Sequence, residues 1–200
     1  MNKTKVYEVY EEIAEWFDEH RNKEVLMEKR YLDLIIKSIP ANSSILDLGC
    51  GTGEPIAKYF IEKAFNLTGI DGSQKMIALC KKRFPNSHWL VADMRTITLN
   101  QRFDAIIAWH SFFHLDHESQ RAMFKIFESH IKPGGILAFT SGTEHGEVWS
   151  NNGGQELYHA SLASNEYQNL LKSSGFEIIL HMEKDPECGC AIIWVARKRQ

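Results

Sequence analysis

Short apolar runs alternate with amphipathic segments along the first two thirds of this chain. The apolar runs predict strands near residues 45–49, 66–71, 88–92, 103–109 and 135–140. The amphipathic segments predict helices near residues 55–64, 73–83 and 117–131. Such alternation is typical of a mostly parallel sheet wrapped by helices. The run at 103–109 is almost continuously apolar, so we expect it at the centre of the sheet.

The alternation stops after Thr140. Residues 141–162 are polar and contain glycine, and a stretch of that length predicts a substrate loop or lid rather than an ordinary connection. A helix is expected near 163–174, and two strand-like runs follow at 176–183 and 190–196. The turn residues between these two runs predict an antiparallel hairpin.

The composition is that of a single domain. Its 200 residues, 44% of them hydrophobic, suffice for one full core and not for two ordinary domains. The net charge of −3 gives no electrostatic footprint for nucleic acid or an anionic membrane. There is no apolar run of roughly 18 residues and no signal-peptide core. The four cysteines lack zinc-type spacing and a secretory context, so we expect no metal and a cytoplasmic protein. From the charge we expect no nucleic-acid or membrane partner, and without a long heptad pattern we expect a monomer or homodimer.

The most informative motif follows the first predicted strand. Asp47 lies near the end of that strand, and three glycines follow at alternate positions, Gly49, Gly51 and Gly53. Glycine permits positive φ and close approach of a ligand, and the next helix offers free N–H groups. A dinucleotide fingerprint would need glycine where Glu54 stands, and no P-loop lysine follows the glycines. The string therefore predicts a nucleotide cradle of another kind.

A second carboxylate ends the second predicted strand. Asp71 lies about 20 residues after the glycines, which is the spacing at which such folds bind ribose hydroxyls. A carboxylate suits that role because it accepts two hydrogen bonds at once. The alternative interpretation is that Asp71 merely caps the helix that starts near Ser73.

The pattern acidic-x-G-x-G-x-G at 47–53 resembles motif I of the class I S-adenosylmethionine-dependent methyltransferases. Residues 90–94 resemble the strand-end acid of that family, 103–115 its fourth motif, and 130–135 the turn before its fifth strand. The resemblance implies an α/β fold: a doubly wound, mostly parallel seven-stranded Rossmann-like sheet, in the order 3-2-1-4-5-7-6. It also implies an antiparallel C-terminal hairpin, an N-terminal helical cap, S-adenosyl-L-methionine as cofactor and S-adenosyl-L-homocysteine as product.

In the far half of the chain, residues 157–162 and 185–189 resemble a bacterial group of small methyltransferases, of types 11 and 12, whose substrates are unassigned. On this basis a single methyltransferase domain spans residues 1–200. We expect it to divide into four parts: a helical cap at 1–40, a cofactor-binding core at 41–140, a substrate loop or lid at 141–162, and a C-terminal helix and β-hairpin at 163–200.

The resemblance assigns roles around the cofactor. Asp71 would bind ribose, Asp93 would pair with the adenine amino group, and Met94 would offer apolar surface to the ring. The residues implied to bind the cofactor are Tyr10, Arg21, Asp47, Gly49, Cys50, Gly51, Thr52, Gly53, Asp71, Gly72, Ser73, Met76, Asp93, Met94, Arg95 and Trp109.

The N-terminal segment predicts a cover. Tyr7, Tyr10, Ala14, Phe17 and Arg21 recur at three- and four-residue steps, so they share one face of a helix. In related methyltransferases such a helix lies over the cofactor, and Arg21 would then clamp its methionine carboxylate. The alternative is an amphipathic helix packed on the core, with Arg21 in solvent.

Polar and aromatic residues after the fourth and fifth predicted strands mark the acceptor side, because ligands of open α/β sheets bind beyond the strand ends. A base is needed only for a protonated acceptor. His110 is the first candidate, since its ordinary pKa near 6.5 suits proton removal at neutral pH, and His145 is the second. His114, Tyr158 and His159 are candidate substrate-binding residues. The alternative for His114 is a structural role, bonding backbone at the start of the following helix.

These features predict a methyltransferase acting on a small-molecule acceptor, because aromatic walls with a few polar groups suit a small ligand. One alternative is a metalloid or thiol methyltransferase, prompted by Cys50, Cys188 and Cys190. Another is a non-catalytic cofactor-binding or scaffold protein of the same fold. Glu54 and the terminal hairpin disfavour an NAD-dependent dehydrogenase.

Overall fold

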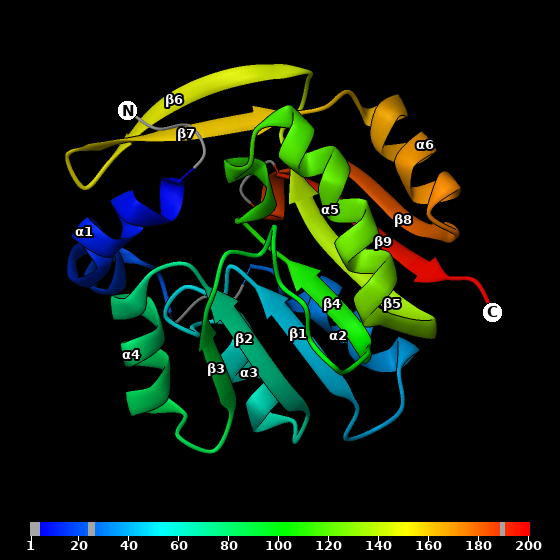
Figure 1. Cartoon of the computed structure of the whole chain (residues 1–200), viewed down its shortest axis with the longest axis horizontal. Helices are drawn as coiled ribbons and strands as arrows, with labels where there is room; N and C mark the ends of the chain where they lie inside the picture. Colours follow the sequence, from blue (N-terminus) through cyan, green and yellow to red (C-terminus); the bar gives the residue numbers. More distant parts are fainter. Residues whose placement is uncertain (1–4, 24–26, 189–190) are drawn as a thin grey trace.

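In the computed structural model, which describes residues 5–23, 27–188 and 191–200, helices cover both faces of a seven-stranded sheet (Figure 1). The strands, in spatial order, are β3 (His88–Val91), β2 (Asn66–Asp71), β1 (Ser44–Leu48), β4 (Phe103–Ala108), β5 (Ile131–Ser141), β9 (Ala191–Lys198) and β8 (Phe176–Asp185). Only β9 pairs antiparallel with its two neighbours. The predicted fold class and spatial order are confirmed, and the strand numbers change because two further strands intervene in the chain.

The helices form two layers. α5 (His117–His130) and α6 (Ser164–Ser173) pack on one face of the sheet. α2 (Lys29–Ser38), α3 (Ile56–Glu62) and α4 (Gln74–Arg83) pack on the other. Because β1 and β4 are covered on both faces, nearly all their side chains are buried, as the apolar run at 103–109 predicts.

The additional strands, β6 (Gly146–Asn152) and β7 (Gln155–Ser161), form an antiparallel ribbon beyond one edge of the helices, above α1 (Val6–His20) (Figure 1). The prediction of a loop over residues 141–162 is therefore wrong, because β6 and β7 lie within this range. Gly153 and Gly154 form the two-residue turn, both at positive φ, +59° and +80°. A glycine pair is a strong hairpin signal because such turns need positive φ at both positions, and sequence analysis missed it.

The start of β5 also differs from the prediction. β5 begins at Ile131, earlier than the predicted 135, because Ile131 already pairs with Phe103 of β4. Two short 3₁₀ turns, η1 (Phe112–His114) and η2 (Pro186–Cys188), complete the elements. No helix among the described residues is long and apolar enough to cross a bilayer.

Parallel pairing places the strand ends at one edge. Asp47 of β1 lies level with Gly69 of β2 and Ile107 of β4, so the chain leaves these strands close together. Asp71, at the end of β2, and Trp109, just after β4, are therefore brought beside the glycine turn. This edge carries the candidate site.

Candidate functional site

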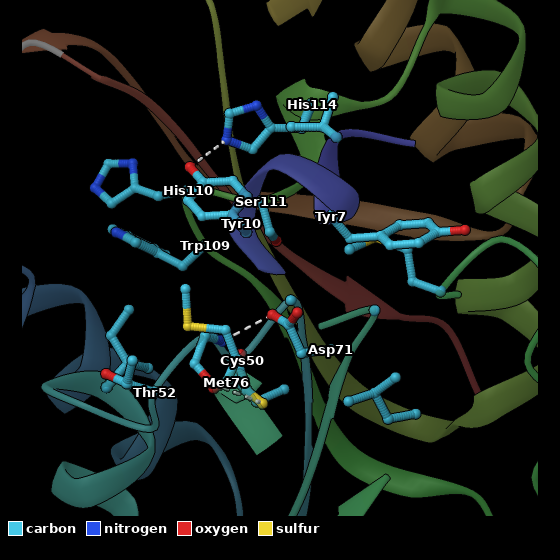
Figure 2. Close-up of a pocket in the computed structure, with 18 of the residues that line it drawn as sticks. Tyr7, Tyr10, Cys50, Thr52, Asp71, Met76, Trp109, His110, Ser111 and His114 are labelled. Atoms are coloured by element: carbon cyan, nitrogen blue, oxygen red, sulfur yellow. Dashed lines mark hydrogen bonds between the residues drawn. The ribbon is translucent and has the colours of Figure 1, made fainter. Parts of the chain in front are cut away.

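A cavity opens at the carboxyl ends of β1, β2 and β4, beneath α1 (Figure 2). We refer to it as the central cavity. Its lining includes most of the residues predicted to bind cofactor and two of the predicted acceptor-side histidines: Tyr10, Arg21, Asp47, Gly49, Cys50, Gly51, Thr52, Asp71, Gly72, Met76, Asp93, Met94, Arg95, Trp109, His110 and His114. Residues from five separated chain segments thus meet at one place.

The glycine turn is shaped by close contacts. Gly49 has a φ of +75°, and a Cβ there would lie 2.3 Å from the Cβ of Ser111. Ser111 is held because its hydroxyl donates a 2.6 Å hydrogen bond to the carbonyl of Leu48. Only glycine therefore fits where β1 passes the segment after β4.

Two carboxylates lie side by side at the strand ends. Asp71 accepts hydrogen bonds from the backbone N–H groups of Gly51, at 3.0 Å, and Ser73, at 2.9 Å. Burial nevertheless raises the pKa of Asp71. Asp47 is 3% exposed, and burial, with the nearby charge of Asp71, raises the pKa of Asp47 to about 7.

Asp71 is not the N-cap residue of α4, as one alternative held. Ser73 is the N-cap of α4, where its hydroxyl accepts the N–H of Met76 at 3.2 Å. Asp71 orders this turn from outside the helix and still lines the cavity. Ser73 lines neither cavity described here, and its hydroxyl donates to Glu11 of α1. Gly53 also lies outside both linings, near Phe84.

Helix α1 covers the central cavity with its aromatic face. The ring of Tyr7 packs against Gly72, where a Cβ would come within 2.4 Å of it. Tyr10 and Phe17 meet edge to face at 5.4 Å between ring centroids. Arg21 follows the last residue of α1, lines the cavity, and donates from Nε to the carbonyl of Glu54 at 3.0 Å. The alternative that leaves Arg21 in solvent does not match this position.

His114 joins three parts of the fold. Its Nδ1 lies 2.8 Å from the carbonyl of Tyr158 in β7, and a carbonyl only accepts, so Nδ1 carries the hydrogen. Nε2 is then the acceptor for the hydroxyl of Tyr10 at 2.9 Å. Burial lowers the pKa of His114 to about 3, so the ring stays neutral. These contacts support the structural role considered for His114. Its backbone partner lies in β7, however, and not at the start of the following helix.

The predicted adenine side carries an ion pair. Nε of Arg95 donates to both carboxylate oxygens of Asp93, at 2.9 and 3.0 Å. This contact contributes to the lowered pKa of Asp93, although burial opposes it. The methyl end of Met94 reaches the glycine turn, 3.2 Å from where a Cβ of Gly49 would stand.

A second cavity, which we refer to as the lid cavity, lies between the end of β5 and the ribbon β6–β7. His110, His145 and His159 line it, and His110 lines the central cavity as well. His145 stacks on His117 with 4.4 Å between ring centroids. Tyr158 lines neither cavity: it is buried in a small apolar cluster between the ribbon and α1.

His110 therefore lies at the junction of the two cavities. Its backbone has a φ of +51°, and its N–H donates to the hydroxyl of buried Thr140 at 2.9 Å. Burial, together with the charge of Arg21, lowers the pKa of His110 to about 4, so the imidazole is neutral at neutral pH. Glu28, which sequence analysis missed, approaches the ring from the start of α2.

Residues 45–135 match the family model described as a methyltransferase domain. This part of the chain is a methyltransferase domain. Among relatives, an amino-sugar N,N-dimethyltransferase of Streptomyces venezuelae, dTDP-3-amino-3,4,6-trideoxy-alpha-D-glucopyranose N,N-dimethyltransferase, is 30% identical over 52% of this chain and 45% of its own. The malonyl-[acyl-carrier protein] O-methyltransferase of Bacillus anthracis is 30% identical over 70% of this chain and 54% of its own. The chain thus spans about half the length of these curated relatives.

Solved structures show the same fold. The amino pentose methyltransferase CalS10 of Micromonospora echinaspora, solved with S-adenosylmethionine, has a TM-score of 0.71 at 19% identity, covering 92% of this chain and 96% of its own. The sugar N-methyltransferase KedS8 of Streptoalloteichus has a TM-score of 0.75 at 18% identity, covering 93% and 92%. The predicted methyltransferase family is confirmed for residues 45–135, and the predicted fold is confirmed by these solved structures, of which CalS10 holds the predicted cofactor, S-adenosylmethionine.

The central cavity of this methyltransferase domain fits such a cofactor. Two buried polar atoms of its lining residues, Oγ1 of Thr52 and Nε1 of Trp109, have no hydrogen-bond partner among the described residues. Buried polar atoms in native proteins normally have partners, so these two indicate a polar ligand. Asp71 offers carboxylate oxygens and Arg21 a guanidinium in the same cavity. The donor set thus suits a ligand with hydroxyl and carboxylate groups.

Proposed function

We propose that this protein transfers a methyl group from S-adenosylmethionine to a small-molecule acceptor. The observation that carries the proposal is the junction at His110, where a cavity suited to the cofactor meets a second cavity lined in part by carboxylates, imidazoles and hydroxyls. S-adenosylmethionine, when bound, supplies a methyl group that is already activated on a sulfonium. The work left to the protein is to hold the acceptor close and aligned, and to remove a proton where the acceptor carries one.

We further propose how the central cavity holds the cofactor. Asp71 would accept hydrogen bonds from ribose hydroxyls. Arg21, Thr52 and Trp109 would serve the methionine end, because a guanidinium, a hydroxyl and an indole N–H can all donate to a carboxylate. Asp93 would accept from the adenine amino group with the lone pairs that Arg95 leaves available.

The lining of the lid cavity favours an amine acceptor. Its ionisable side chains are the carboxylates of Glu144 and Glu147 and three imidazoles, and none of its described lining residues is a lysine or arginine. Such a lining repels phosphates and carboxylates and suits a protonated amine. Four hydroxyl side chains, Ser141, Thr143, Ser150 and Ser161, suit an acceptor that also carries hydroxyls. The N-methylation of sugars named for two of the similar proteins supports the same choice, whereas the Bacillus anthracis relative is named as an O-methyltransferase.

The thiol or metalloid alternative finds no support in the cysteines. Cys188 lines neither cavity, and burial raises the pKa of its thiol to about 12. Burial also raises the pKa of Cys50, whereas reactive cysteines have a lowered pKa. Cys190 lies outside the described residues. The non-catalytic alternative is decided by experiment.

Calorimetric titration with S-adenosylhomocysteine, and with NAD as a control ligand, tests the cofactor first. We expect binding of the former alone, weakened in an Asp71→Asn variant. Binding should persist in Asp104→Asn, whose carboxylate lies beside Lys132, outside the cavity linings. Absence of binding by folded wild-type protein would refute the proposal.

Turnover is tested with methyl-labelled S-adenosylmethionine and a metabolite extract. Labelled products are separated by charge at neutral pH, and we expect the label in cationic compounds. Label confined to anionic products would overturn the amine acceptor. Cofactor binding without labelled product from any extract would favour a non-catalytic protein. The cytoplasmic location and the monomeric or homodimeric state stay predictions.

A further inference from the structure

A buried carboxylate lies behind the junction of the two cavities. Glu28 is 3% exposed and is the N-cap residue of α2. Its Oε1 lies 3.8 Å from Nε2 of His110 and 3.9 Å from Nη2 of Arg21. Glu28 itself lines neither cavity, whereas both of its partners line the central one. A buried carboxylate is unfavourable unless positive charge or hydrogen bonds compensate it, so these two contacts and the helix start stabilise it.

The backbone of His110 is held in place beside this carboxylate, at a side-chain distance longer than a hydrogen bond. A φ of +51° is uncommon for any residue other than glycine, and such strain is kept where the surrounding structure imposes it. The hydrogen bond from its N–H to Thr140 fixes the backbone on the other side. Phe113 packs beside the ring, with 6.0 Å between centroids. The imidazole therefore has one nitrogen directed to Glu28, which leaves the other for a ligand.

Other charges also act on this ring. Arg21, at the end of α1, lowers the pKa of His110, and His114 of η1 stays neutral. From the far side, further titratable groups line the lid cavity that His110 shares: Glu144, His145, Glu147 and His159. Among these acidic groups, Glu28 is buried and its carboxylate lies 3.8 Å from the ring.

We propose that Glu28 is a positioning residue for His110, and this rests on the proposed function. Its negative charge, 3.8 Å from Nε2, favours the tautomer with hydrogen on that nitrogen, which leaves Nδ1 as the proton acceptor. A protonated amine in the lid cavity gives its N–H proton to Nδ1 and keeps the electron pair that forms the new N–C bond to the transferred methyl. The resulting imidazolium is stabilised by Glu28, much as a carboxylate orients and stabilises a catalytic histidine in hydrolases. The proton leaves to solvent when the product departs.

Nitrogen-15 NMR of imidazole-labelled protein tests this without any acceptor. The spectra distinguish the two tautomers, and a His110→Asn variant identifies the signals. We expect the Nε2–H tautomer for His110 in wild type, both free and with S-adenosylhomocysteine. Glu28→Gln should convert it to a mixture or to the Nδ1–H form. Glu187→Gln, an exposed carboxylate paired with Arg30, should leave it unchanged. An unchanged tautomer in Glu28→Gln would overturn the proposal.

Methyl transfer to the amine found in the extract gives the second measurement. Glu28→Gln should lower kcat by about 100-fold, the lower end of general-base effects, with a KM change below about threefold. In the His110→Asn background the same substitution should add no further loss, because the two act as one unit. Additive losses, or an equal fall in melting temperature and activity, would indicate a merely structural role. If wild type fails to bind S-adenosylhomocysteine, the proposed function fails, while the tautomer of the free protein still tests Glu28.

Discussion

Asp47 should make the unliganded protein less stable as the pH rises through neutrality. Its pKa is about 7 in the folded protein, against about 3.9 for an unperturbed aspartate. A raised pKa means that folding disfavours the charged form. The penalty is absent below pH 4, grows as pH rises from 4 to 7, and is complete above pH 7. At about 1.4 kcal/mol per unit, a shift of three units makes about 4 kcal/mol, of which about 3 kcal/mol develops between pH 5 and pH 8.

The Asp47→Asn variant removes this titration. Its free energy of unfolding, measured by urea at pH 5, 6, 7 and 8, should exceed that of wild type by about 3 kcal/mol more at pH 8 than at pH 5. Asp71, whose pKa is also raised by burial, leaves a slope of the same sign in both proteins. Parallel curves for wild type and variant would refute the reasoning.

The matched control is Asp104→Asn. Lys132 and Ser44 hold the carboxylate of Asp104, and its pKa is lowered despite partial burial. A lowered pKa stabilises the folded state above the unfolded pKa, and this stability is lost as pH falls through the folded value. Asp104→Asn should therefore lower the free energy of unfolding at pH 7, whereas Asp47→Asn should raise it.

Three further predictions concern the central cavity. Gly49→Ala should lower the free energy of unfolding by about 3 kcal/mol in urea titrations, because its Cβ would overlap Ser111 at positive φ; unchanged stability would contradict this contact. Tyr10→Phe should lower it by about 2 kcal/mol, since Nε2 of His114 loses its donor, and an unaltered urea midpoint would count against that hydrogen bond. Arg21→Met should weaken S-adenosylhomocysteine binding about tenfold in calorimetry yet spare 5′-methylthioadenosine, which lacks the carboxylate; equal losses for both ligands would remove Arg21 from the methionine end.

Local signals account for the parts of this fold that were predictable from sequence. The glycine string is readable because Gly49 must adopt positive φ within a few residues of the strand that precedes it. The run at 103–109 is readable because a strand covered on both faces must be apolar throughout. The same logic should have shown the ribbon, since Gly153 and Gly154 stand between strand-like segments. The polarity and length of residues 141–162 hid this turn signal.

Contacts between distant segments account for what was not predictable. The hydroxyl of Tyr10 reaches His114 across 104 positions of the chain, and no periodicity encodes that partner. Glu28 belongs to a polar stretch with no motif, and its burial depends on how α2 begins beside the end of α1. Tyr158 and His159 are neighbours on β7 and point to opposite faces of the ribbon, so His159 lines the lid cavity while Tyr158 packs against α1.

The two sides of the site depend on different parts of the fold. The proposed cofactor side is built from the glycine turn and the ends of β2 and β4, which the seven-stranded sheet places together. The proposed acceptor side depends on the ribbon, which forms a separate sheet and contributes Val148, Ser150 and His159 to the lid cavity. The ribbon can therefore change its residues without disturbing the sheet that positions the cofactor. His110 is the point where the two sides meet, so its orientation by Glu28 would couple an adaptable acceptor pocket to an invariant methyl donor.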